Sequence, residues 1–240
     1  MSKWTSVAGT VRIKRSGASG RVHRLLSAFV NQLGTHARAH HRRSDDVPYA
    51  YNESQMHSIV FPAFHDVCQL VFREQPLERR PRAEGESGGH GAVDCWLERE
   101  GRFFMVEYKH SDFSLGHQKF HTWAQQEWST GQAQLGTILE HGGPDLLESE
   151  IKGTALLLMS VRHYRTSKKG RPRSSDAKAC WKSHKALLSQ VADHDATAHP
   201  VNWSALWMAP ADMRHLEYAE SFAHIPAVSL LAASAPVVGD

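Results

Sequence analysis

Residues 91–109 show the clearest alternation of apolar and polar positions in the chain. Two runs rich in Val, Trp, Phe and Tyr lie on either side of Glu100-Gly101, and a glycine in the second central position is typical of a two-residue hairpin turn. We therefore predict a β-hairpin in which Arg99 pairs with Arg102. The predicted core-facing side of this hairpin is apolar throughout and comprises Val93, Cys95, Leu97, Phe104, Val106 and Tyr108.

The opposite face of the hairpin carries three charged groups. In the predicted register Asp94 lies directly across from Glu107, and Lys109 follows on the same face. A slip of one residue would bury these charges and turn the apolar side chains toward water. Two facing carboxylates repel each other unless a cation lies between them, and oxygen ligands with room for water suit Mg²⁺. The pattern predicts a metal site here; the alternative is a charged, partly exposed rim.

Apolar positions elsewhere predict the remaining elements. Helices are expected over 21–41, 53–72, 117–141, 177–191 and 212–224. Asn52 is a favourable N-cap for the second of these helices, and Gly131 is expected to break or bend the third. Further strands are expected over 73–82, 154–164 and 201–208. Residues 1–20 are basic and contain Gly and Ser, so we expect no regular structure there.

The order of these elements predicts an α/β fold with a mixed central sheet flanked by helices. Helix, strand, hairpin, helix and strand follow one another between residues 50 and 165. The 240 residues suffice for one large domain, or for a domain with an extension. We expect a basic N-terminal extension with a helix over 1–48 and a main domain over 49–240, with a basic loop and C-terminal additions after residue 165.

Positive charge is concentrated in two segments, although the net charge is only +3. Residues 1–44 contain nine Lys and Arg and no acidic residue, and residues 162–185 contain nine more against a single Asp. Such segregation indicates a polyanionic partner. The residues expected to contact the phosphate backbone are Lys168, Lys169, Arg171 and Arg173. The alternative for this segment is a solvated charged loop.

Cysteine usage and hydropathy indicate the compartment. The three cysteines have no paired or CxxC spacing, which favours a reducing, cytoplasmic location and argues against a structural zinc site. No signal peptide is apparent at the N-terminus. The apolar run over 225–238 is short and is interrupted by Pro226 and Pro236, so we expect no membrane partner.

The Asp, the hairpin and the following Glu-x-Lys together resemble the PD-(D/E)xK nuclease superfamily, which has the restriction-endonuclease-like fold. In this chain the motif is Val93-Asp94 followed by Glu107-Tyr108-Lys109, and Val93 replaces the Pro that names the motif. The resemblance covers about residues 50–165, where the predicted order matches the αβββαβ core of that fold. Agreement of motif and element order makes the resemblance more specific than an isolated Glu-x-Lys.

The resemblance implies a role for each motif residue. Asp94, Glu107 and the Tyr108 carbonyl would bind Mg²⁺, with Mn²⁺ as an alternative ion. Lys109 would orient or help to deprotonate the attacking water. Glu53, at the start of the preceding helix, matches a position that often contributes a metal ligand; its alternative role is to stabilise the positive helix N-terminus. A Gln of the next helix sometimes assists in related nucleases, and the candidates are Gln118, Gln125, Gln132 and Gln134.

The expected function is metal-dependent hydrolysis of phosphodiester bonds in DNA by an endonuclease, with RNA as an alternative substrate. The resemblance favours DNA, and cleavage of both strands by one site per chain favours a homodimer or higher homo-oligomer. Restriction, phage defence and repair are all compatible settings. Two other classes stay open: a nucleic-acid-binding protein without catalysis, and a nucleotide-sensing domain on the same fold.

Overall fold

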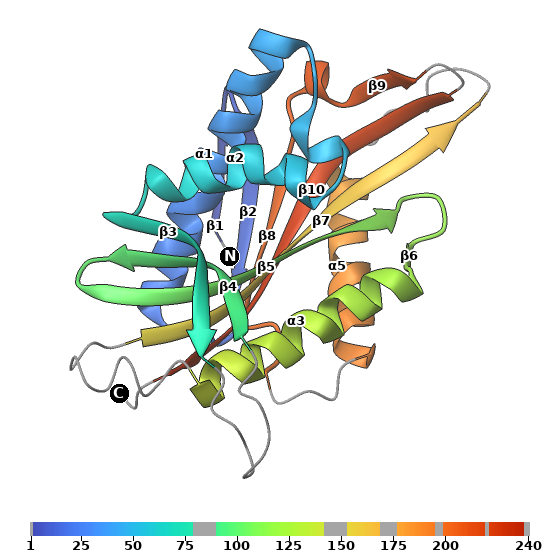
Figure 1. Ribbon diagram of the computed structural model, residues 1–240. Helices are drawn as coiled ribbons and strands as arrows, with labels where there is room; N and C mark the ends of the chain where they lie inside the picture. The colour runs from blue at the N-terminus through green and yellow to red at the C-terminus, as the bar shows by residue number, and fades with distance from the viewer. Residues whose placement is uncertain are drawn as a thin grey trace.

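A single twisted sheet forms the centre of the protein in a computed structural model (Figure 1). The structure describes residues 2–78, 90–141, 153–168, 177–194, 199–218 and 221–237. Within these ranges the sheet has ten strands, and its main path runs in the order β1-β2-β8-β10-β7-β5-β4-β3. The short strands β6 and β9 pair with β5 and β10. All pairs are antiparallel except β5 with β7, so the sheet is mixed.

The strands are β1 Ser2–Ser6, β2 Gly9–Arg15, β3 Leu70–Glu78, β4 His90–Arg99, β5 Arg102–Ser114, β6 Lys119–Phe120, β7 Gly153–Ser167, β8 Trp203–Met208, β9 His215–Tyr218 and β10 Ser221–Pro236. The α-helices are α1 Gly20–Ser44, α2 Glu53–His65, α3 Thr122–His141 and α5 Ala177–His194. Two 3₁₀ helices span Pro48–Ala50 and Ala211–Met213.

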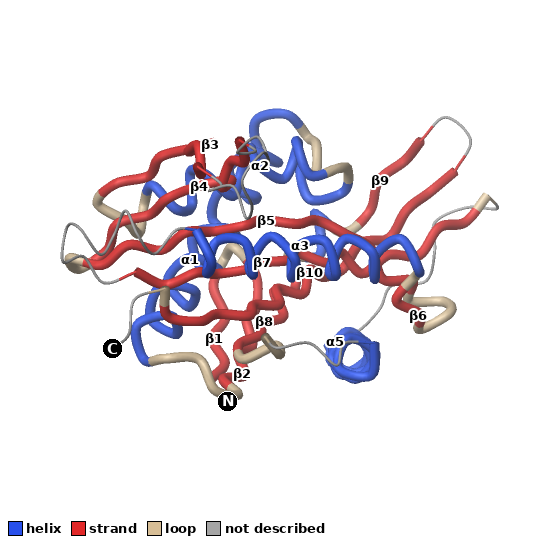
Figure 2. The backbone as a smooth tube through the Cα atoms, turned by 60° about the horizontal axis from the view of Figure 1, so that its bottom comes forward, coloured by secondary structure: helices blue, strands red, loops and turns tan. Residues whose placement is uncertain are grey.

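Helices cover both faces of the sheet. On one face α1 and α2 bury their apolar stripes, and the α1 stripe of Val22, Leu25, Leu26, Phe29, Val30 and Leu33 is fully enclosed. On the other face α3 packs on β5 and β7, and α5 packs on β8 and β10. Figure 2 shows α3 running roughly along β5 and β7, with α5 seen end-on below it. The expected α/β architecture, a mixed sheet flanked by helices, is confirmed.

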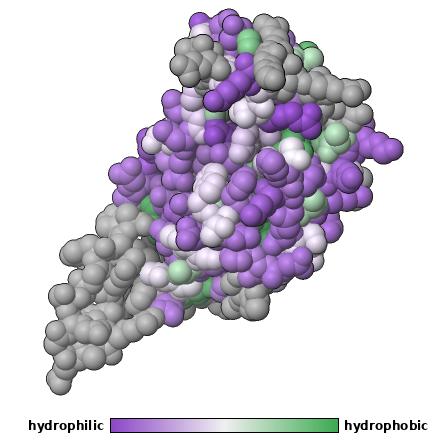
Figure 3. All heavy atoms as spheres, turned by 90° about the vertical axis from the view of Figure 1, so that its right-hand side faces the viewer, coloured by the Kyte–Doolittle hydropathy of each residue, from purple (hydrophilic) through white to green (hydrophobic). Residues whose placement is uncertain are grey.

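One face of the molecule can be described by its hydropathy. The face in Figure 3 is largely hydrophilic, and its hydrophobic residues form small, separate groups. Among the described residues no helix is both long enough and apolar enough to cross a bilayer.

Both ends of the chain differ from expectation. Residues 2–15 form β1 and β2 instead of an irregular segment, because Val11 and Ile13 alternate with polar residues and enter the core. Together with α1 they belong to the same sheet and core as the residues after 48. The helix expected over 212–224 is also wrong, since β9 and the start of β10 occupy that region.

Two helices have different bounds from those expected. α2 starts at Glu53 with an Asn52 capping box, as predicted, but ends at His65, because the chain turns and Leu70 pairs with β4 at Glu98. α3 is continuous through Gly131. A Cβ at that position would lie 2.5 Å from a Leu157 methyl carbon, so the glycine allows close packing on the sheet and does not break the helix.

The hairpin has the predicted register only near its turn. Pairing runs from Arg99 with Arg102 to Cys95 with Val106 and stops there, so the expected pair of Asp94 with Glu107 is not formed. Beyond this point alternation in β4 fails, and Val93 packs on the α3 side while Cys95 packs on the α1 side.

A polar cluster lies buried between the sheet and α5. The rings of His163 and His184 both hydrogen-bond the Ser229 hydroxyl, at 2.6 Å and 2.7 Å. Both rings are fully buried. Burial, with a smaller contribution from nearby positive charge, lowers the pKa of each histidine to about 3. The nearby charge is that of His184 for His163 and that of Lys14 for His184.

Lowering the pH from about 7.5 to about 5 should therefore reduce the free energy of unfolding. Below a pH of about 6.5 the unfolded chain binds protons that these buried rings exclude, so stability present above that pH is lost as the pH falls toward 3. Over the same pH change a His184→Gln variant should lose less unfolding free energy than the wild-type protein. The difference should be up to about 1.4 kcal/mol per pH unit. Urea unfolding at both pH values, with the exposed His117→Gln as control, tests this; equal losses in all three proteins would contradict it.

Two helical glycines should respond oppositely to alanine. At Gly34 of α1 a Cβ would lie 2.7 Å from the Trp207 indole nitrogen, which donates to the Ala8 carbonyl at 2.9 Å. Gly34→Ala should lower the free energy of unfolding by about 1–3 kcal/mol, because overpacking outweighs the better helix propensity. At Gly136 of α3 nothing lies within 4 Å, so Gly136→Ala should raise it by up to about 1 kcal/mol. Urea unfolding measures both; the same sign at both sites would disprove the packing argument.

Candidate active site

Four predicted site residues meet where β4 leaves β5. Glu107 and Lys109 lie on β5, and the Lys109 ammonium donates to Glu107 Oε1 at 2.8 Å. The Glu107 side chain is 2% exposed and that of Lys109 12%, so the ion pair is largely removed from solvent. Asp94 comes from β4 and Glu53 from the first turn of α2. Three segments distant in the sequence thus supply three carboxylates around one ammonium.

Backbone hydrogen bonds hold two of these carboxylates. The Tyr108 amide donates to Asp94 Oδ2 at 2.7 Å, and the His110 amide donates to Glu53 Oε2 at 3.0 Å. Both amides belong to the edge of β5 that faces away from β7, where β4 no longer pairs. The N–H and C=O of one strand residue point to the same edge, so the Tyr108 carbonyl also faces this edge.

Charge is unbalanced toward negative in this cluster. Burial and the Asp94 carboxylate raise the pKa of Glu107 to about 7, although the hydrogen bond from Lys109 lowers it. Burial also raises the pKa of Glu53. For Lys109, burial lowers the pKa, but the hydrogen bond to Glu107 and the surrounding carboxylates outweigh burial, and the net shift is upward. Lys109 is therefore held in its protonated form.

Residues of β7 support the site from beneath. The Ser160 hydroxyl lies 2.5 Å from the Tyr108 hydroxyl and 2.7 Å from His110 Nδ1, so it links the two residues whose amides bind the carboxylates. Arg162 forms an ion pair with Asp112 and donates to the Tyr51 carbonyl at 2.9 Å. Tyr51 directly precedes the N-cap of α2, and this contact fixes the helix start that carries Glu53.

The donor set of this cluster is chemically suited to a hard divalent cation. It offers carboxylate oxygens with excess negative charge, together with a backbone carbonyl on the same edge, and these are the ligands that Mg²⁺ prefers. The Asp94 and Glu53 carboxylates each accept their backbone hydrogen bond through one of their two oxygens. Within the described part of the chain no three His, Cys, Asp or Glu side chains are arranged to hold a metal. The carboxylates point to the amides and to Lys109, so metal binding requires them to turn.

The predicted phosphate contacts are not gathered at this site. Lys168 is exposed just after β7, nine residues beyond Met159, which pairs with Lys109. That separation corresponds to roughly 30 Å along the strand. The other three, Lys169, Arg171 and Arg173, lie outside the described residues.

The structure adds His57 to the site. Its ring centroid lies 5.5 Å from that of Tyr108, and its Nε2 is buried without a hydrogen-bond partner among the described residues. Burial lowers the pKa of His57, against the opposing effect of the Asp94 charge. The spacing of four residues from Glu53 on one helix is the sequence signal that could have identified it. Of the four glutamines, Gln118 and Gln132 bind elsewhere, to Ser183 and to the His199 carbonyl.

The ion pair should show strong energetic coupling. Lys109→Met should reduce the free energy of unfolding by about 3–5 kcal/mol, because it leaves the buried Glu107 without its cation. Adding Glu107→Gln to that variant should restore part of the loss. Urea unfolding of both single variants and the double variant, in EDTA at about pH 8, completes the cycle. Effects that add to within about 0.5 kcal/mol would rule out the coupling.

Comparison with known proteins leaves the function to be argued from this geometry. The sequence matches no model of a protein family and no curated protein, and the fold matches no solved structure.

Proposed function

We propose that this protein is a metal-dependent nuclease that hydrolyses phosphodiester bonds in DNA. The observation that carries the proposal is the convergence of Glu53, Asp94 and Glu107 on Lys109 at an unpaired strand edge. Among the described residues the elements follow one another in the order α2-β3-β4-β5-β6-α3-β7, which supports a restriction-endonuclease-like core. Motif and element order together support membership of the PD-(D/E)xK superfamily.

The metal ligands in this proposal are Asp94, Glu107, the Tyr108 carbonyl and Glu53, for Mg²⁺ or in its place Mn²⁺. When bound, the ion would lower the pKa of a water molecule and stabilise negative charge on the phosphate. Lys109 would donate a hydrogen bond to the attacking water or to a phosphate oxygen. Its raised pKa favours this role over that of a base. Ser160 and Arg162 would keep the backbone of β5 and the start of α2 in place.

Positive charge segregated from the acidic parts of the chain supports a polyanionic substrate. We propose DNA, cut internally, and a homodimer if both strands are cleaved, because each chain has one such cluster among its described residues. Restriction, phage defence and repair are settings in which such a cytoplasmic activity would serve.

A second candidate function is nucleic-acid binding or nucleotide sensing without catalysis. It is favoured by a specific observation: the carboxylates of Asp94 and Glu53 already satisfy strand amides, and Glu107 already has its ammonium partner. A cluster that is complete without a metal can serve the fold alone. Metal-dependent product formation separates the two functions.

Alanine at either Lys109 or Asp94 should abolish cleavage. We expect Lys109→Ala to reduce the rate by at least about 100-fold, because a preorganised donor to developing negative charge is lost. Asp94→Ala should do the same through loss of metal binding, and DNA binding should persist in both variants. The measurement is incubation with linear DNA, circular DNA and RNA in Mg²⁺, Mn²⁺ or EDTA, followed by electrophoresis.

Matched controls are Lys119→Ala and Asp193→Asn, which change exposed residues outside the cluster. Both should retain wild-type rates. Wild-type rates in Lys109→Ala, or cleavage in EDTA, would refute the proposed mechanism. Metal-independent binding without any product would favour the second candidate.

A further inference from the structure

A groove lies between β2 and one flank of α5, on the side of the sheet that α3 also covers. The flank residues recur every three or four positions: Lys178, Trp181, Lys185, Leu188 and Ala192. Across from them β2 presents Arg12 and Lys14, which alternation places on one face, and Ser16 follows the strand. We call this feature the β2–α5 groove.

The end of the groove near the start of α5 is cationic. The Arg12 guanidinium lies 5.5 Å from the ring centroid of Trp181, and the Lys185 ammonium 5.9 Å from it. His184 stacks on the same indole with centroids 5.1 Å apart, which fixes the ring. The same indole thus attracts two cations.

Within the described residues no ion pair joins Arg12, Lys14 or Lys185 to a carboxylate. Arg12 Nε is in addition buried without a hydrogen-bond partner there. Unneutralised charge held in one place by a rigid ring is available to an anionic ligand.

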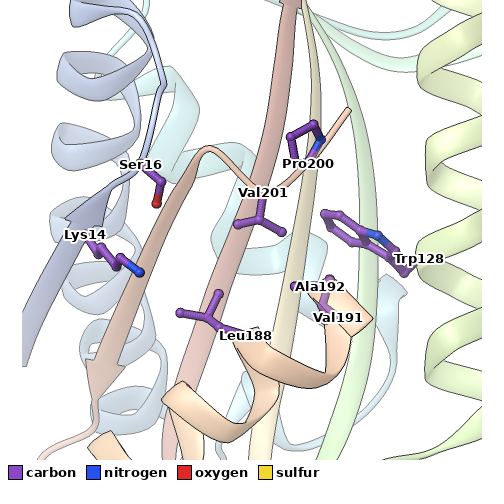
Figure 4. Close-up of a pocket in the computed structure, with 8 residues that line it drawn as sticks. All are labelled: Lys14, Ser16, Trp128, Leu188, Val191, Ala192, Pro200 and Val201. Atoms are coloured by element: carbon purple, nitrogen blue, oxygen red, sulfur yellow. The ribbon is translucent and has the colours of Figure 1, made fainter. Parts of the chain in front are cut away.

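The other end of the groove opens into an apolar cavity of about 330 Å³. Its walls are Trp128, Leu188, Val191, Ala192, Pro200 and Val201. Figure 4 shows Lys14 and Ser16 on one side of this cavity and Trp128 on the opposite side. Both Lys14 and Ser16 are exposed, so the cavity opens toward the charged part of the groove.

We propose that the β2–α5 groove binds single-stranded nucleic acid. Arg12, Lys14 and Lys185 would contact successive phosphates, and one unstacked base would enter the cavity against Leu188 and Trp128. Positive charge tracking the backbone beside apolar or aromatic base contacts is the usual design of single-strand sites. Bases of a duplex are paired and stacked, so they cannot enter the cavity.

The length of the charged flank favours a polyanion over a small ligand with one acidic group. Lys178 and Lys185 are seven residues apart on α5, which corresponds to about 10 Å. Their charges extend beyond the cavity mouth at Lys14, and a single carboxylate or phosphate would leave most of them unused.

The groove also contacts the helix that covers the candidate active site. Trp128 of α3 lines the cavity, and one turn later a Cβ at Gly131 would lie 3.3 Å from Lys109 Cγ. The inference rests on the proposed nuclease function only in that the bound strand would be the substrate or its product; binding itself requires no catalysis.

Fluorescence anisotropy in EDTA tests the charged part of the groove. The probes are a labelled oligo-dT of about 20 nucleotides, oligo-U of the same length and a duplex of the same length. The triple variant Arg12→Gln/Lys14→Gln/Lys185→Gln should reduce the slope of log K against log salt by about 2 for the single strands, at about 0.7 per phosphate contact. The control variant Arg21→Gln/Arg42→Gln/Arg43→Gln removes the same charge from exposed positions of α1, outside the groove, and should reduce the slope clearly less than the groove variant does.

Filling the cavity tests base insertion. Ala192 is exposed at the mouth, so Ala192→Phe should fold, and it should weaken single-strand binding by roughly 10-fold without changing the salt slope. Ala192→Ser leaves the cavity open and should bind normally. A preference for oligo-dT or for oligo-U identifies which nucleic acid the groove takes, and equal affinity supports recognition of the chemistry they share.

The inference is overturned if the groove triple variant behaves like the α1 control, or if the duplex binds as tightly as the single strands and responds equally to Ala192→Phe. Cleavage measured separately in Mg²⁺ keeps the two proposals distinct. If binding depends on the groove but no cleavage is seen, only the proposed nuclease function is refuted. If cleavage is seen but the groove variants bind normally, only the proposed single-strand site is refuted.

Discussion

The structure depends on how the backbone of β5 is satisfied along its two edges. One edge pairs with β7 in parallel over the full length from Phe103 to Ser114, while the other pairs with β4 only as far as Val106. Buried amides beyond that point require other acceptors. The carboxylates of Asp94 and Glu53 fill that need, so the backbone itself determines where two acidic side chains gather. The hydrogen bonds that satisfy the amides of β5 are therefore the same ones that bring the acidic side chains of the cluster together.

This dual role explains why the strand below is polar at two positions. Leu156 and Leu158 of β7 are apolar core residues, yet the polar residues Ser160 and Arg162 follow them on the same face, which also carries Tyr108. Ser160 ties that tyrosine to His110, and Arg162 ties the start of α2 to the sheet. Polar groups at such depth are costly unless satisfied, and here the hydroxyl and the guanidinium have partners. Through these contacts Ser160 and Arg162 fix the positions of β5, β7 and the start of α2 relative to one another.

Local alternation was sufficient to predict the part of the hairpin near its turn and the coarse architecture, because one-sided burial leaves a readable pattern. It also assigned Asp94, Glu107 and Lys109 to one end of the hairpin, where the structure brings them together, whereas Glu53 was suggested by the family resemblance. Alternation failed at Asp94, where the Asp94 carboxylate replaces a backbone acceptor for the Tyr108 amide. There Val93 and Cys95 pack on opposite sides of the sheet, although two residues this far apart normally share a face. It failed again at β10, which is buried on both sides and therefore shows no alternation. Pro226, which suggested interruption, lies at a register shift between His224 and Ala227, where a strand tolerates proline. His57 and the buried histidine cluster depend on tertiary neighbours that no local pattern encodes.

The position of β10 has a consequence for the order of folding. This late strand lies between β7 and β8 in the middle of the sheet, and among the described strands β2 pairs with β1 and β8. The contact between Trp207 and Ala8 joins residues 199 positions apart. The second edge of β2 can therefore pair only after residues 203–208 have been synthesised. Such non-local pairing slows folding and leaves apolar surface exposed meanwhile, so the nascent chain is expected to need protection from aggregation until the β8–β10 pair closes the sheet.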